Sequence, residues 1–140
     1  MSGDSDEHEG GCYCGAVRYK INGAPKWSGH CHCRSCQKAL GGAFVTWAKV
    51  AADDFAVTKG TIKKCSINDG VERGFCGDCG TTLTYGATEL VEGQNWSGDA
   101  WFAAATLDDP SICNPQTHVF VSHRQPWIKL ADGLPNFDEF

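Results

Sequence analysis

The sequence GGCYCGAVRYKI, residues 10–21, joins a cysteine pair to an alternating stretch typical of a β-strand. A later stretch, FCGDCGTTLTY at residues 75–85, repeats this order of cysteine pair, glycine and strand. Gly15 and Gly80 directly follow the two pairs, and glycine permits the tight turn that aims backbone N–H groups at a thiolate. Four thiolates close a tetrahedron around zinc in a structural site. We therefore expect the two pairs to share one zinc ion on Cys12, Cys14, Cys76 and Cys79.

A third cluster, CHCRSC at residues 31–36, supplies three more cysteines: Cys31, Cys33 and Cys36. Three protein ligands with an open fourth position are typical of a catalytic zinc. Three thiolates leave a divalent ion with a net negative charge, so the ion is a weak Lewis acid. Such an ion suits an external thiol, which it keeps deprotonated. The spacing therefore predicts a catalytic, thiol-binding site at these three residues.

The same cluster could instead form a second structural site, with His32, another histidine or Cys65 as the fourth ligand. His32 lies between two ligands in an extended stretch, so its side chain is expected to point away from the metal. Cys65 and Cys113 stand alone, and we expect both to be small buried apolar residues. All-sulfur sites can also hold iron, but nothing else in the sequence suggests electron transfer, so zinc is favoured at both sites.

The composition is that of one soluble globular domain of 140 residues, with 17 acidic and 12 basic side chains and a net charge of −5. The acidic balance argues against binding to nucleic acid or to an anionic membrane. No apolar run approaches the roughly 20 residues of a membrane span. Residues 1–10 are expected to form a flexible acidic tail without a signal peptide, and residues 11–140 a single cytoplasmic domain. Nine cysteines, an odd number, favour metal ligands in a reducing compartment over disulfides.

Short β-strands separated by turn residues are predicted along most of the chain, which is typical of a sandwich or a related all-β fold. The predicted strands are residues 15–21, 27–33, 43–50, 55–58, 61–67, 71–76, 81–85, 101–106 and 117–121. Lys59-Gly60 predicts a hairpin between two of them, and residues 68–70 predict a turn. Residues 34–40 are expected to form a short helical turn, whereas several prolines disfavour a helical C-terminal quarter. Exposed strand edges suggest a homodimer.

The order and spacing of these motifs resemble the glutathione-dependent formaldehyde-activating enzyme family over residues 10–140. The segments that carry the resemblance are residues 10–19, 31–37, 75–83, 106–110, 118–120 and 132–135, together with Trp127. The resemblance implies an Mss4-like β-tent of antiparallel sheets with little helix. It also implies a structural zinc on the two glycine-flanked cysteine pairs. A second zinc is implied on Cys31, Cys33 and Cys36, with water or a thiol in the fourth position.

The activity that the resemblance implies joins formaldehyde and glutathione as S-(hydroxymethyl)glutathione, which is carbon–sulfur lyase chemistry run in reverse. A thiolate would attack the aldehyde carbon, and the resulting alkoxide would need a proton donor. The candidate donors are His32, His118 and His123. The candidate partners for the carboxylates of an anionic thiol are Arg34, Lys38 and Arg124. The aromatic residues that could wall a pocket are Trp47, Trp101, Phe120 and Trp127.

A second class of function stays open. The histidines and basic residues could lie at the surface or in the packing, and the aromatic residues could form an ordinary core. The chain would then be a non-catalytic zinc scaffold that binds a protein partner through a sheet face. The two hypotheses differ at the second zinc, because a catalytic site keeps an exchangeable ligand and a scaffold has four protein ligands.

Overall fold

Strands are the main secondary structure of the described part of the chain, which comprises residues 6–66, 70–87 and 98–140 of the computed structural model. The strands are β1 (Glu7–Gly11), β2 (Arg18–Asn22), β3 (Trp27–Cys31), β4 (Val45–Ala51), β5 (Phe55–Lys59), β6 (Ile62–Cys65), β7 (Val71–Cys76), β8 (Thr82–Ala87), β9 (Asp99–Ala103) and β10 (His118–Val119). One α-helix, α1 (Arg34–Leu40), lies between β3 and β4 in these ranges. The short 3₁₀ turns are η2 (Ala52–Asp54), η3 (Ala104–Thr106), η4 (Pro110–Ile112) and η5 (Val121–His123). The expectation of an all-β fold with little helix is confirmed.

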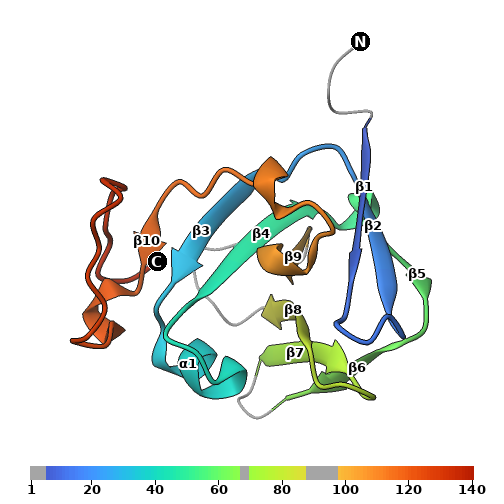
Figure 1. Ribbon diagram of the computed structural model, residues 1–140, viewed down its shortest axis with the longest axis horizontal. Helices are drawn as coiled ribbons and strands as arrows, with labels where there is room; N and C mark the ends of the chain where they lie inside the picture. Colours follow the sequence, from blue (N-terminus) through green and yellow to red (C-terminus); the bar gives the residue numbers. More distant parts are fainter. Residues whose placement is uncertain (1–5, 67–69, 88–97) are drawn as a thin grey trace.

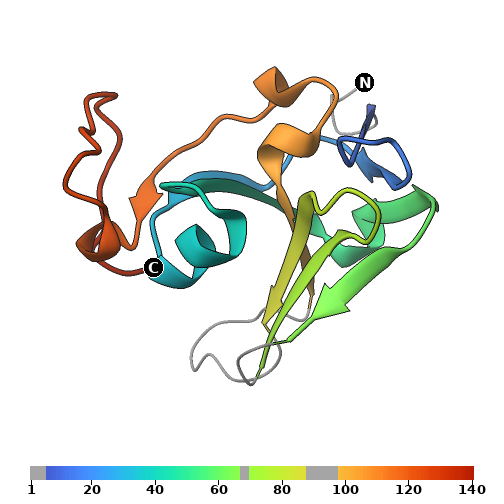
Figure 2. The same cartoon turned by 60° about the horizontal axis from the view of Figure 1, so that its bottom comes forward.

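The strands form two sheets (Figure 1). The smaller sheet has the order β1-β2-β5, and the larger has the order β10-β3-β4-β9-β8-β7-β6. Neighbouring strands run antiparallel except β10 and β3, which run parallel. Figure 2 brings α1 to the front, between the C-terminal segment and strands β7 and β8. The helix therefore lies near strands that are distant from it in the sequence.

Two hydrophobic cores lie on opposite faces of the larger sheet because side chains alternate along each strand. On β4, Ala48 and Val50 belong to the first core, whereas Val45 and Trp47 belong to the second. The first core also contains Tyr19 of the smaller sheet, whose ring stacks on Phe55 with a centroid distance of 4.9 Å. Each core contains cysteines of a different cluster. Cys12 and Cys76 belong to the first core, and Cys31 and Cys36 belong to the second.

The expected flexible tail is wrong for residues 7–10, which lie in β1, while residues 1–5 are outside the described part of the chain. β1 pairs with β2 along its whole length, and Glu7 forms an ion pair with Lys20 at 3.3 Å. Gly10 packs so closely on Tyr19 that a Cβ there would lie 2.6 Å from the phenol. Pairing with a buried strand therefore orders this acidic segment despite its polar composition.

The expected hairpin at Lys59-Gly60 is also wrong. β5 pairs with β2 in the smaller sheet, and β6 pairs with β7 in the larger one. Gly60 adopts a φ of 72° and lies against the Ala16 carbonyl, so the chain crosses here from one sheet to the other. The predicted turn is present, but the two strands that it connects pair with strands of different sheets.

Several predicted strands are shorter than expected, including two in the C-terminal part of the chain. The strand expected at residues 101–106 ends at Ala103 and continues as η3, and the strand expected at 117–121 is reduced to β10. Phe120 has a φ of 55°, which is incompatible with an extended strand. The predicted turn at residues 68–70 falls largely on residues 67–69, which lie outside the described residues. No helix in the described residues is long and apolar enough to cross a membrane.

Candidate metal centres

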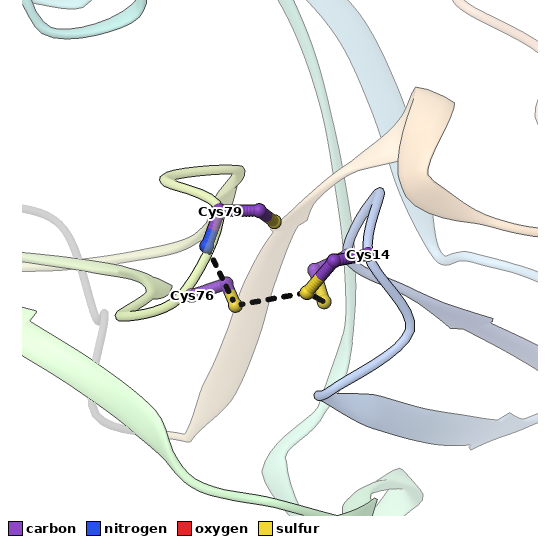
Figure 3. Close-up of side chains that lie close together, drawn as sticks. Cys14, Cys76 and Cys79 are labelled. Carbon is purple, nitrogen blue, oxygen red and sulfur yellow. Dashed lines mark hydrogen bonds between the residues drawn. The ribbon is translucent and has the colours of Figure 1, made fainter.

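Cys12, Cys14, Cys76 and Cys79 form a four-cysteine group where the turn between β1 and β2 meets the end of β7 and the turn that follows it. Figure 3 shows three of these side chains, Cys14, Cys76 and Cys79, close together. All four sulfur atoms lie within 4.8 Å of one another. The Sγ of Cys14 is 3.6 Å from that of Cys12 and 3.8 Å from that of Cys76. Zn–S bonds of ~2.3 Å in a tetrahedron place sulfur atoms about 3.8 Å apart. The geometry therefore fits zinc.

Backbone N–H groups point at these sulfurs in the way that the glycine pattern predicts. The Val17 amide donates to the Cys12 Sγ at 3.2 Å, and the Cys79 amide donates to the Cys76 Sγ at 3.4 Å. Hydrogen bonds from the Thr81 side chain and backbone lower the pKa of Cys79 to about 6. These donors stabilise thiolates, which are the metal-binding form of cysteine.

Cys31, Cys33 and Cys36 form a three-cysteine group at the junction of β3 and α1. Cys33 caps the helix, and its Sγ accepts the Cys36 amide proton at 3.3 Å. The Sγ atoms of Cys31 and Cys36 are 3.9 Å apart, which again fits ligands of one zinc ion. In the described residues, no fourth histidine, cysteine, aspartate or glutamate joins this group.

The three thiols are crowded enough to shift one another's ionisation. Hydrogen bonds with the Cys31 and Cys36 thiols lower the pKa of Cys33 to about 2. The pKa of Cys31 is raised, mainly because its thiol bonds with Cys33 and Cys36. Cys31 and Cys36 are also buried, with exposed fractions of 6% and 3%. Such a cluster favours a cation that can neutralise several thiolates in a small space.

Aromatic residues of the second core surround the three-cysteine group. Trp47 and Trp101 belong to this core and Phe120 packs against it, whereas Trp127 lies outside it and is 66% exposed. Tyr85 also packs against this core, with its ring 5.6 Å from the Trp47 ring. Sequence reasoning missed Tyr85 because only the fold brings β8 to the group.

Arg73 is a second residue that sequence reasoning missed. Its guanidinium nitrogens Nη1 and Nη2 each lie 3.8 Å from the Cys36 Sγ. The alternation of β7 indicates that Arg73 and Cys76 point to opposite faces of the strand. The sequence therefore predicts these opposite orientations, but it does not reveal that the three-cysteine group lies on the same face of β7 as Arg73.

The histidines lie on the other side of β3. His32 is fully buried, and its Nε2 is 2.9 Å from the His118 Nδ1. The His118 Nε2 is in turn 2.8 Å from a carboxylate oxygen of Asp132. Burial and the nearby His118 charge lower the pKa of His32 to about 4. His32 therefore points away from the three-cysteine group and remains neutral.

His30, His118 and Asp132 also bring three potential metal-binding atoms within 4.8 Å of one another. Both ring nitrogens of His118 already have hydrogen-bond partners, and the His30 Nδ1 lies 2.8 Å from the Thr46 hydroxyl. Hydrogen bonds therefore account for this arrangement, which joins β3, β4 and the C-terminal segment.

The remaining candidate residues lie around α1. The Arg34 amide donates to the His123 Nδ1 at 3.2 Å, which links the helix to η5. Arg34 and Lys38 line a groove of about 470 Å³ together with Trp127, and the groove has no cysteine in its lining. Arg124 is exposed.

The two single cysteines differ from the expectation. Cys65 is exposed on β6, so its expected burial is wrong, and Cys113 is half-buried beside the first core. Neither residue belongs to a group of potential ligands in the described part of the chain.

Comparison with known families and curated proteins gives consistent matches. A family model described as "Glutathione-dependent formaldehyde-activating enzyme" matches residues 7–123. An "Uncharacterized lyase" of Schizosaccharomyces pombe is 34% identical over 83 residues, which span 59% of this chain and 59% of the relative. A "Putative glutathione-dependent formaldehyde-activating enzyme" of Halomonas elongata is 26% identical over 132 residues, which span 87% of this chain and 80% of the relative.

A solved structure shares the fold. A protein of Rhodobacter sphaeroides matches with a TM-score of 0.54 over 92% of this chain and 98% of its own chain. The sequences are only 16% identical, so this similarity concerns the fold alone.

Proposed function

The chain belongs to the glutathione-dependent formaldehyde-activating enzyme family, and from this premise we propose that it is a lyase acting on the carbon–sulfur bond between a small thiol and an aldehyde. The curated relatives are named as a lyase and as an enzyme of this family, which supports the proposal. In the synthetic direction, the sulfur of a thiol such as glutathione bonds to the carbon of formaldehyde. The C=O π bond breaks, and the proton lost from sulfur ends on oxygen, so no co-reactant is needed.

The observation that carries this proposal is the three-cysteine group without a fourth protein ligand in the described residues. Cys31, Cys33 and Cys36 would hold a catalytic zinc, which when bound supplies the Lewis acidity that keeps a coordinated thiol deprotonated. Their position beside Trp47 and Trp101 gives the site an apolar wall. An apolar wall limits water and strengthens electrostatic interactions inside the site.

The four-cysteine group has a different proposed role. Its four sulfurs would close the coordination of a structural zinc and join the two sheets. Residues 11–140 would then fold as one domain, in which metal binding contributes to the folding free energy.

A test compares Cys33→Ser with Cys65→Ser. Cys33 belongs to the three-cysteine group, whereas Cys65 is an exposed cysteine outside both groups. Exchange between glutathione and its hydroxymethyl adduct would be followed by NMR with purified zinc-loaded protein. We expect Cys33→Ser to reduce the rate above background by at least about tenfold. Cys65→Ser should match the wild type.

Metal content gives the second measurement. The proposal expects two zinc ions per wild-type chain and per Cys65→Ser chain, and fewer in Cys33→Ser. Turnover by Cys33→Ser equal to that of the wild type would refute the catalytic assignment. Two zinc sites that each exchange no ligand would instead favour the non-catalytic scaffold.

A further inference from the structure

Arg73 brings a positive charge to the three-cysteine group from a distant strand. Both Nη atoms lie 3.8 Å from the Cys36 Sγ. The guanidinium carbon lies 4.9 Å from the centre of the Tyr85 ring, a cation–π contact that helps to fix its position. Among the residues that the structure describes, no carboxylate forms an ion pair with Arg73. The guanidinium therefore interacts with sulfur and an aromatic ring rather than with an acid.

The sheet register explains why Arg73 reaches this group. Arg73 on β7 lies opposite Tyr85 on β8, and Tyr85 lies opposite Trp101 on β9. Paired positions in antiparallel strands point to the same face. Tyr85 and Trp101 both lie in or against the second core, which also contains Cys36. The backbone of the larger sheet thus holds Arg73 on the side of the three-cysteine group.

The charge of the group makes this contact significant. Three thiolates on a divalent ion leave one net negative charge, and an incoming thiolate would add another. Cys31 and Cys36 are buried, so water screens these charges poorly. A guanidinium donates charge-assisted hydrogen bonds and stays protonated throughout the physiological pH range. Without Arg73, electrostatic repulsion by the anionic centre would weaken the binding of an anion.

We propose that Arg73 is a positioning residue that balances the charge of the three-cysteine group and thereby selects an anionic thiolate as its ligand. The inference rests on the proposed thiol-binding function and adds the residue that makes such binding favourable. It also names the ligand class, because a charge partner favours an anion over a neutral ligand of similar size. A residue that only supported the fold would not discriminate between the two.

The experiment measures ligand binding rather than turnover. The protein is loaded with Co²⁺ in place of zinc, and its absorption spectrum is titrated with glutathione and separately with neutral imidazole. The variants are Arg73→Gln, Arg73→Lys and the control Lys64→Gln. Lys64 lies on the neighbouring strand β6 and pairs with Glu72 at 3.3 Å. Its register partner is Gly74, so it points to the opposite face from Arg73.

Arg73→Gln is expected to weaken glutathione binding by more than about tenfold while changing imidazole binding by less than about twofold. Arg73→Lys keeps the charge, so its ratio of glutathione to imidazole affinity should stay within about threefold of the wild-type ratio. Lys64→Gln should leave both affinities unchanged. If Arg73→Gln does not fold, Arg73→Lys alone tests the proposal. A fall of more than about tenfold in its ratio of glutathione to imidazole affinity would then overturn the proposal.

Two further outcomes separate this inference from the proposed function. Equal effects of Arg73→Gln on both ligands, or no effect on either, would overturn the role of Arg73 while leaving the thiol site intact. Failure of the wild-type protein to bind glutathione at the cobalt ion would instead refute the proposed function, and with it this inference.

Discussion

Gly15 and Gly80 occupy equivalent positions in the two turns that carry the four-cysteine group. Their φ values are 83° and 81°, in the left-handed region that other residues seldom adopt. A Cβ built on either glycine meets no other atom within 4 Å. The requirement for glycine therefore comes from backbone conformation and not from lack of space.

Gly80→Ala is expected to lower the free energy of unfolding of the zinc-loaded protein by about 1–2 kcal/mol, because alanine is strained at this φ. Urea denaturation measures the change. Gly77→Ala is the matched control in the same turn, since Gly77 has no positive φ and its Cβ would meet only the flexible Lys63 side chain, at 3.3 Å. The control should stay within about 0.5 kcal/mol of the wild type. Equal losses in both variants would contradict the conformational explanation.

At the scale of elements, local sequence signals identified most positions, and long-range contacts decided the rest. The predicted ranges 34–40 and 71–76 coincide with α1 and β7. The partner of β5 was not predictable, because the Lys59-Gly60 turn is compatible both with a hairpin and with a crossing between sheets. The distinction between local sequence signals and long-range contacts also applies to the candidate metal centres. Cysteine spacing is local and grouped the sulfurs correctly, whereas the contact of Arg73 with Cys36 depends on how α1 packs near β7.

The start of β9 offers a test of pairing at this scale. Asp99 accepts a hydrogen bond from the Lys26 ammonium at 2.6 Å and lies 3.6 Å from the Lys49 ammonium. The hydrogen bond from Lys26, followed by the charges of both lysines, holds the pKa of Asp99 below its ordinary value of 3.8. The folded state therefore binds the proton less tightly than the unfolded state. The resulting stabilisation is complete above 3.8 and is lost as pH falls through the lowered pKa.

Asp99→Asn is expected to reduce the free energy of unfolding by about 1 kcal/mol at neutral pH. The difference between wild type and variant should stay constant between about pH 7 and pH 5, and shrink only in stronger acid. Urea denaturation of both proteins at each pH measures this difference. Loss of metal in acid should affect the two proteins equally, so it should not change the difference between them. A difference that already disappears near pH 6 would show that Asp99 is not the group responsible.

At the scale of the whole molecule, the four-cysteine group is the proposed link between the two sheets. Cys12 and Cys14 lie in the turn between β1 and β2 of the smaller sheet, whereas Cys76 ends β7 of the larger sheet and Cys79 lies in the turn that follows it. A shared zinc would close a long loop in the chain and stabilise the first core between the sheets.

Cys76→Ser is therefore expected to give an insoluble or unfolded protein, because it removes a buried ligand from this link. Cys113→Ser, at a half-buried cysteine outside both groups, is the control and should remain soluble with two zinc ions. Thermal unfolding and metal analysis provide the measurement. Recovery of Cys76→Ser with full metal content and unchanged melting would refute the shared site.

The four sulfurs of this link are unequally protected, since Cys14 and Cys79 are exposed while Cys12 and Cys76 are buried. Peroxide in the surrounding water would therefore oxidise Cys14 and Cys79 first. Its attack would release the turn after β7, the strand from which Arg73 reaches Cys36. Oxidative damage at the protein surface would in this way disable a distant centre whose own sulfurs had not reacted.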